Sequence, residues 1–154
     1  MEQMKPVVFK LDEELYGIDI ICVQGIEKGQ QIVRVPNTAS YIRGIMNLRG
    51  EVIPVYDLRK KFGMPENNGK DVQYIIVRSS DNTLLALEVD VVDEIHNYTQ
   101  GELHPIPEIV KNRDTEYFNY VINSEKGMVI IIDIDRILTA DEKKQIENMK
   151  ETLQ

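Results

Sequence analysis

The sequence predicts a mostly-β protein made of two related units, and three observations support this prediction. The apolar residues make up 42% of the 154-residue chain and are rich in Val and Ile, with no Trp and three Phe, a composition that favours strands. Short apolar runs alternate with polar turns. The chain also repeats itself. Short strands at close spacing favour small closed barrels, which remove exposed sheet edges.

Seven short segments of the sequence have strand signals. The predicted strands are 7–11, 15–20, 33–35, 52–55, 74–78, 84–89 and 128–132. The first two are joined by an acidic turn, and 74–78 and 84–89 form a second hairpin. The strand 33–35 ends at Pro36. Pro54 lacks an N–H, so its strand belongs at a sheet edge or beside a bulge.

Helix signals are few. A short turn of helix is expected to begin at Asn37 or Thr38 and to end before Gly44. Asp57 is expected to cap a second turn over 58–62, and Gly63 then ends it. The C-terminal helix, 139–154, has Asp and Glu in its first turn. Apolar residues three and four apart, Ile146, Met149 and Leu153, give that helix one face that can dock.

The repeat has two matching pairs of segments in the same order. Residues 15–26 match 84–95 in apolar and acidic positions, and 50–58 match 127–134 with one gap. The segment 63–71 contains Gly, Pro and Asn where strands disfavour them, and it is the predicted connector.

We therefore expect one domain over 1–154, with a first β-barrel unit at about 15–69 and a second at about 70–138. Terminal strands are expected to be exchanged between the two units, followed by the C-terminal helix 139–154. The connector is short, so the units should pack together.

Composition excludes several classes of protein. The net charge of −8 opposes nucleic-acid binding, which needs a basic face. Cys22, the one cysteine, forms no internal disulfide and indicates a reducing compartment. The N-terminal residues lack the pattern of a signal peptide. The longest apolar run, 128–132, is far shorter than the roughly twenty residues of a membrane span. These features predict a soluble cytoplasmic protein.

The sequence offers no set of catalytic residues. Cys22 lies in a predicted apolar strand without a basic neighbour to stabilise a thiolate. The spacing of His96 and His104 fits neither a helical metal pair nor a zinc ribbon. The clustered carboxylates occur in a turn and at a helix start, and the glycines are single. We expect no enzyme activity, metal or cofactor.

One segment, 42–58, stands apart because its apolar residues alternate with Asn47, Arg49 and Asp57 in an expected loop between helix and strand. Such a loop must pack inward or offer a binding surface. The segment closely resembles the signature of CheW, the bacterial chemotaxis coupling protein family. The resemblance covers about 6–138, and its motifs are Tyr16-Gly17-Ile18-Asp19, Val23-Gln24, Pro36-Asn37-Thr38, Ile42-Arg43-Gly44, Asn47-Leu48-Arg49-Gly50, Val52-Ile53-Pro54-Val55-Tyr56-Asp57-Leu58-Arg59 and Thr115-Glu116-Tyr117.

The resemblance implies two intertwined five-stranded SH3-like barrels around a shared core. It also implies a scaffold without catalytic activity or cofactor, joining the regulatory domain of the histidine kinase CheA to the cytoplasmic tips of methyl-accepting chemoreceptors. Such a protein works in the cytoplasm, recruited to membrane-associated receptor arrays, and does not insert into the membrane.

The resemblance also implies two sets of contact residues. The residues at the receptor groove between the barrels are Val23, Ile26, Arg49, Ala86, Val92 and Ile95. The kinase-binding residues are His104 and Ile109, where some relatives have a basic and an aromatic residue. Gly25 is a further departure, because some relatives have an acidic receptor-contacting residue there. Plain core burial remains an alternative for Val23, Ile26, Val92 and Ile95.

Other functions remain open alternatives. The departure at Gly25 is compatible with a coupling module of a non-chemotactic receptor–kinase array. The CheV variant of the family is disfavoured, because this sequence ends soon after the coupling region. A hydrolase that uses surface carboxylates and a nucleic-acid-binding barrel are weaker alternatives, opposed by the ordinary placement of the acids and by the net charge.

Overall fold

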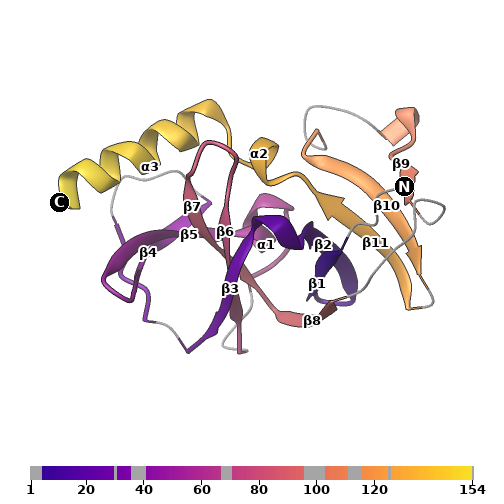
Figure 1. Ribbon diagram of the computed structural model, residues 1–154, viewed down its shortest axis with the longest axis horizontal. Helices are drawn as coiled ribbons and strands as arrows, with labels where there is room; N and C mark the ends of the chain where they lie inside the picture. Colours follow the sequence, from indigo (N-terminus) through magenta and orange to yellow (C-terminus); the bar gives the residue numbers. More distant parts are fainter. Residues whose placement is uncertain are drawn as a thin grey trace.

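The computed structural model describes residues 5–29, 31–35, 41–66, 71–95, 103–110, 116–124 and 126–153 (Figure 1). The strands are β1 (Pro6–Leu11), β2 (Glu14–Asp19), β3 (Val23–Lys28), β4 (Ile42–Leu48), β5 (Glu51–Asp57), β6 (Gln73–Arg78), β7 (Leu84–Val89), β8 (Val91–Ile95), β9 (Leu103–Pro105), β10 (Phe118–Ser124) and β11 (Gly127–Ile132). The helices are η1 (Ile20–Cys22), α1 (Leu58–Lys61), η3 (Glu108–Val110), α2 (Ile134–Ile137) and α3 (Ala140–Leu153). No helix of the described residues is both long enough and apolar enough to cross a membrane.

The strands form two sheets. The six-stranded sheet has the order β8-β1-β2-β11-β10-β9, and the five-stranded sheet has the order β3-β6-β7-β5-β4 (Figure 1). β3 follows β2 in the chain but pairs with β6, whereas β8 follows β7 but pairs with β1. The prediction of a mostly-β fold with two intertwined units is confirmed, and one sheet has a sixth strand, β9. The bounds 15–69 and 70–138 of the two units remain a prediction. Each of these two segments contributes strands to both sheets.

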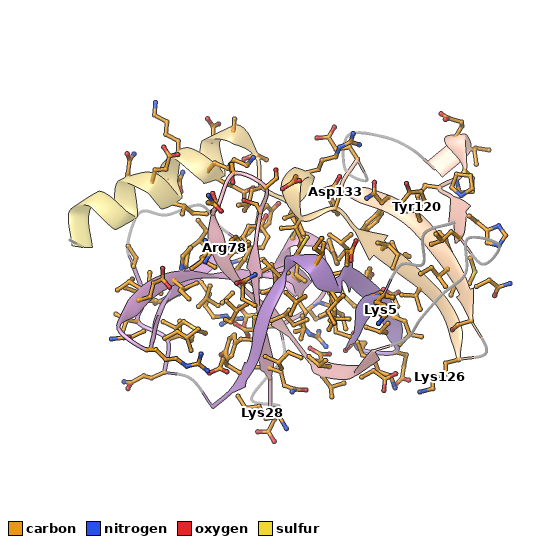
Figure 2. All side chains as sticks on the ribbon, in the orientation of Figure 1. Lys5, Lys28, Arg78, Tyr120, Lys126 and Asp133 are labelled. Carbon is orange, nitrogen blue, oxygen red and sulfur yellow. The ribbon has the colours of Figure 1, made fainter. Side chains whose placement is uncertain are left out.

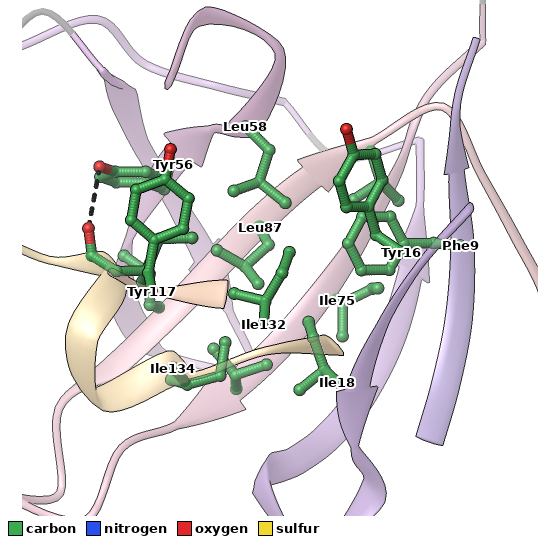
Figure 3. Close-up of a cluster of buried hydrophobic side chains, with 14 of the residues drawn as sticks. Phe9, Tyr16, Ile18, Tyr56, Leu58, Ile75, Leu87, Tyr117, Ile132 and Ile134 are labelled. Atoms are coloured by element: carbon green, nitrogen blue, oxygen red, sulfur yellow. Dashed lines mark hydrogen bonds between the residues drawn. The ribbon is translucent and has the colours of Figure 1, made fainter. Parts of the chain in front are cut away.

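Alternation along the strands divides the apolar side chains among three cores. The largest core lies between the sheets and includes Phe9, Tyr56 and Leu87, all fully buried (Figure 3). The opposite face of the five-stranded sheet forms a core around Met46, and the opposite face of the six-stranded sheet forms another, which contains Ile122. Because successive strand residues face opposite ways, each sheet is buried on both faces.

The internal repeat is visible in the backbone. β5 leads into α1 and runs parallel to β7, and β11 leads into α2 and runs parallel to β2. Asp57 caps α1 by accepting a hydrogen bond from Lys60 N, as predicted, and Asp133 caps α2 in the equivalent place. The N–H of Asp57 donates to Tyr41 O at 2.8 Å, and that of Asp133 donates to Tyr117 O at 2.7 Å.

The segment 42–48 corrects the prediction of a helix that ends before Gly44, and also the prediction of a loop there. It is strand β4, in which Ile42, Gly44 and Met46 are buried in alternation. Gly44 does not end a helix. A Cβ at Gly44 would lie 2.2 Å from Val33 O, so glycine permits the close approach of the chain at Val33. The proposed caps Asn37 and Thr38 lie outside the described residues.

One further strand prediction needs correction, and the prediction for Pro54 holds in one of its two forms. The segment 33–35 is not a strand, because only Val33 forms an isolated bridge, with Ile45. Pro54 was expected at a sheet edge or beside a bulge, and the second alternative is confirmed: β5 is an interior strand, and the register of β4 shifts between Ile42 and Gly44, next to the Ile45–Pro54 pair. Ile45, opposite Pro54, exchanges both of its backbone hydrogen bonds with Val33. Ile45 therefore needs no backbone N–H donor from Pro54. The pairing of β5 with β7 begins one residue later, at Val55.

The C-terminal helix begins as predicted. Thr139 Oγ1 accepts from Glu142 N at 3.1 Å, and Glu142 Oε1 accepts from Thr139 N at 2.8 Å. This reciprocal arrangement is a capping box. Ile146 is buried in the core between the sheets, so the first turns of α3 dock there. The side chains of Met149 and Leu153 lie outside the described residues.

Candidate partner-binding surfaces

The described residues hold no group of three or more His, Cys, Asp and Glu side chains that could bind a metal ion. Cys22, expected in an apolar strand, is the last residue of η1 and is partly buried. Burial raises the pKa of its thiol, and the nearby carboxylate of Asp19 raises it further. A raised pKa keeps the thiol protonated, which is the reverse of what a nucleophilic cysteine needs.

Arg49 lies at the tip of the β4–β5 hairpin. Leu48 pairs with Glu51, so Arg49 and Gly50 form a two-residue turn. Both have positive φ, 54° for Arg49 and 86° for Gly50, as a type I′ turn requires. Asn47 Oδ1 accepts from Gly50 N at 2.9 Å and holds the turn. The exposed Arg49 guanidinium forms no salt bridge within the described part of the chain, so it is available to a partner.

Val23 and Ile26 lie on β3, at the edge of the five-stranded sheet. They pair with Val77 and Ile75, which belong to the core between the sheets. Val23 is partly buried against that core, and Ile26 is 39% exposed. A register shift follows Val23. Gly25 pairs with Ile76 and faces the other side of the sheet. Arg49 lies on that side, so β3 separates Arg49 from Val23 and Ile26.

Val92 and Ile95 lie on β8, at the edge of the six-stranded sheet. Val92 pairs with Phe9 and is partly buried against the core between the sheets. Its N–H donates to Gln73 Oε1 at 2.7 Å, which joins β8 to β6 of the other sheet. Ile95 pairs with Val7, and its side chain lies outside the described residues.

Ala86 does not lie on a surface. It is 0% exposed in β7, an interior strand, and packs in the core around Met46. Ala86 therefore cannot touch a partner in this conformation, and we do not retain it as a contact residue.

His104 and Ile109 lie on the other sheet. His104 is exposed on the edge strand β9, opposite Val121 of β10. Ile109, in η3, is 93% exposed. Tyr120 of β10 pairs with Pro105 and is also partly exposed. Isolated exposed apolar residues are ordinary, but an almost fully exposed isoleucine beside a sheet edge offers apolar area that a partner can cover.

The three basic residues of α1, Arg59, Lys60 and Lys61, differ in their exposure to solvent. Arg59 is buried and binds Asp12, Asp90 and Pro65 O. Its guanidinium joins the β1–β2 turn to the end of β7. Lys60 is exposed. These contacts cross long stretches of sequence, so no local pattern could predict them.

Lys61 belongs to a groove of about 980 Å³ beside α1, the turn before β10 and the start of α3. Its Nζ lies 4.9 Å from the Tyr41 ring centre, 5.4 Å from that of Tyr117 and 3.8 Å from Glu142 Oε1. The ammonium group is already held by cation–π and ionic contacts, so we assign Lys61 a structural role.

A smaller cavity, of about 250 Å³, lies beside Arg49. Its lining residues are Gln24, Gly25, Glu27, Leu48, Arg49, Glu51, Ile53, Ile76, Arg78 and Leu84. Sequence reasoning singled out Arg49 and Gly25 separately and did not bring them together. It also missed Arg78, which gives no local signal at the end of its strand.

Comparisons with known proteins agree with this architecture. The family model of the CheW-like domain matches residues 5–142. The chain is 32% identical to Chemotaxis protein CheW of Klebsiella aerogenes, over 93% of this chain and 86% of that protein. It is also 32% identical to Chemotaxis protein CheW of Bacillus subtilis, over 87% and 86%. The crystal structure of the scaffolding protein TtCheW from Thermoanaerobacter tengcongensis has a TM-score of 0.82, with 36% identity, over 92% of this chain and 96% of that one.

Proposed function

Because the chain belongs to the CheW-like domain family, we propose that it is a non-catalytic adaptor that couples methyl-accepting chemoreceptors to the histidine kinase CheA. The proposal places it in the cytoplasm, recruited to membrane-associated receptor arrays, without a cofactor. Chemotaxis and a scaffolding role are what its relatives are named for. The coupling of these two partners is the step that we add.

The observation that supports the proposal best is the separation of two exposed surfaces. Arg49 and Ile26 lie on the five-stranded sheet, at or beside its edges. Ile109 and His104 lie beside the far edge of the six-stranded sheet. β4 and β9 lie at opposite ends of the molecule in Figure 1. An adaptor needs two surfaces that two partners can occupy at once, and this arrangement provides them.

The receptor surface fits an α-helical partner. β3 is an edge strand, so a helix lying along it can reach Ile26 on one face and Arg49 beside the other. Apolar anchors of a helix suit the partly buried aliphatic side chains, and a free guanidinium can hydrogen-bond its carboxylates or terminal carbonyls. On the kinase surface, Ile109 and Tyr120 are the exposed large apolar residues, and Ile109 is the more exposed of the two.

The test is a double dissociation between two single variants. Purified protein is titrated with the regulatory domain of a CheA from the same genome and, separately, with a receptor cytoplasmic hairpin. Ile109→Ala should weaken kinase binding about tenfold, or about 1.4 kcal/mol, and leave receptor binding unchanged. Arg49→Ala should do the reverse.

Two matched variants control for the kind of side chain removed. Val33→Ala removes another exposed aliphatic residue, away from η3, and Arg136→Ala removes another exposed arginine. Both should bind each partner as wild type does. If wild type bound neither partner at micromolar concentrations, the coupling function would be wrong. Equal effects of both test variants on both partners would contradict separate surfaces.

A further inference from the structure

The cavity beside Arg49 lies in the gap between the two edges of the five-stranded sheet. Gln24, Gly25 and Glu27 of β3 form one side, and the β4–β5 turn forms the other. β3 and β6 run antiparallel, with Lys28 opposite Gln73. Arg78, at the other end of β6, lines the cavity and Lys28 does not; Figure 2 shows these two residues far apart.

Gly25 leaves this cavity open, and nothing in the fold requires glycine there. A Cβ at Gly17 would lie 2.8 Å from Ile131 Cδ1, and one at Gly44 would lie 2.2 Å from Val33 O, so those glycines are needed for packing. A Cβ at Gly25 would meet no atom within 4 Å, and its φ lies outside the left-handed region. Glycine inside a strand costs roughly 0.5–1 kcal/mol relative to alanine. Such a glycine often marks a place where a ligand approaches closely.

The cavity has an apolar floor. Ile53, Ile76 and Leu84 are buried and belong to the core around Met46, and Leu48 is partly buried against it. Engineered apolar cavities of about 150 Å³ bind benzene. At about 250 Å³, this cavity has room for one large aliphatic or aromatic side chain.

The rim carries both signs of charge. Arg49 and Arg78 line it together with Glu27 and Glu51. None of the four forms a salt bridge within the described residues. Two positive and two negative groups cancel, so the cavity gives no net preference for an ionised side chain. Its floor then favours an apolar one, and the rim groups remain free to hydrogen-bond the polar side chains around it.

We propose that Gly25 opens a pocket that receives one large apolar side chain, such as Leu, Met or Phe, from the receptor helix that packs along β3. This inference rests on the proposed function, since it refines how the receptor surface recognises its partner. A single anchor in a desolvated pocket commonly dominates an interface. Gly25 is thus a specificity-determining position, because any larger residue there takes the space of the anchor.

The main test fills the pocket. Gly25→Leu and, as a second variant, Gly25→Met should weaken binding of the receptor hairpin at least tenfold and leave binding of the kinase regulatory domain unchanged. Because a Cβ there meets no atom, both should keep the wild-type circular dichroism spectrum. Glu13→Leu adds the same side chain to the exposed β1–β2 turn, away from β3 and the pocket, and should leave both affinities unchanged. Wild-type receptor affinity in Gly25→Leu would overturn the inference.

A second measurement does not depend on the receptor. Benzene added to ¹⁵N-labelled protein should shift the amide resonances of Gln24–Glu27 and Leu48–Glu51, and should not shift them in Gly25→Leu. If wild type bound no receptor but benzene gave these shifts, the pocket would stand and the proposed function would fail. If benzene left these amides unmoved in wild type, the pocket itself would be refuted.

Discussion

Arg49 should be a residue whose replacement stabilises the fold while removing a function. Its φ of 54° lies in the left-handed region, which side chains other than Gly, Asn and Asp adopt at a cost. It is the first central residue of a two-residue turn, where Asn-Gly is the preferred sequence. Arg49→Asn creates that sequence with Gly50 and leaves the hydrogen bond from Gly50 N to Asn47 Oδ1 in place.

The size of the effect follows from the backbone alone. A left-handed conformation costs an L-residue about 1–2 kcal/mol, and Asn relieves part of it. The Arg49 side chain forms no hydrogen bond or salt bridge within the described part of the chain, so its loss should cost little. Arg49→Asn should therefore raise the free energy of unfolding by about 1 kcal/mol, and a chain of this length should gain about 2–4 °C in Tm.

Urea unfolding followed by circular dichroism measures this difference. Arg49→Ala is the matched control, because it removes the guanidinium but keeps a Cβ without an Asn amide, and its stability should stay within about 0.5 kcal/mol of wild type. Both variants should lose receptor binding. If Arg49→Asn were no more stable than Arg49→Ala, relief of backbone strain would be refuted. Retained strain at a binding residue is the stability–function compromise expected of such sites.

Two further predictions concern charged groups away from the partner surfaces. Arg59→Met leaves the carboxylates of Asp12 and Asp90 without their buried guanidinium and should lower the free energy of unfolding in urea by about 3 kcal/mol; an unchanged value would contradict this. Hydrogen bonds from Ser79 and then from Thr83 lower the pKa of Asp81 from 3.8 to about 2, so the folded state favours the carboxylate. This stabilisation is present above pH 4 and is lost as the pH falls to 2. Asp81→Asn should be slightly less stable than wild type at pH 7 and equal to it near pH 2, and parallel pH profiles of unfolding would refute the assignment.

Elements defined by neighbouring residues could be predicted from the sequence. The β1–β2 and β6–β7 hairpins carry their own alternation and turns, and the caps at Asp57 and Thr139 act within one turn of helix. β4 was mistaken for a helix and a loop because Gly44 resembles a helix stop. The actual role of Gly44 is to allow the close approach of Val33, which depends on a contact between residues eleven positions apart in the sequence.

The candidate site could be predicted only in part, because it too depends on contacts between residues that are distant in the sequence. The resemblance supplied Arg49 and Ile109, and both are exposed. It also supplied Ala86, which is buried, because alternation alone does not say that β7 is covered on both faces. The cavity at Gly25 depends on two sheet edges that face each other, with β3 exchanged into this sheet. No local pattern encodes that arrangement.

The repeat duplicates the backbone but not the charges on it. Arg43 lies at the register shift of β4 and binds two carboxylates of neighbouring strands, Asp57 at 2.8 Å and Glu88 at 2.6 Å. Burial raises the pKa of Glu88, and Arg43 opposes that rise. In this half of the molecule the two acids are matched by a guanidinium from the same chain.

The other half has the same geometry without the arginine. The register shift of β10 contains Asn119 where β4 has Arg43, and the parallel register puts Asp133 and Asp19 where Asp57 and Glu88 lie. The Asp133 carboxylate instead pairs with Arg136 of α2, at 3.6 Å, and both acids help to raise the pKa of Cys22. Two halves with one backbone thus present different charges at equivalent places.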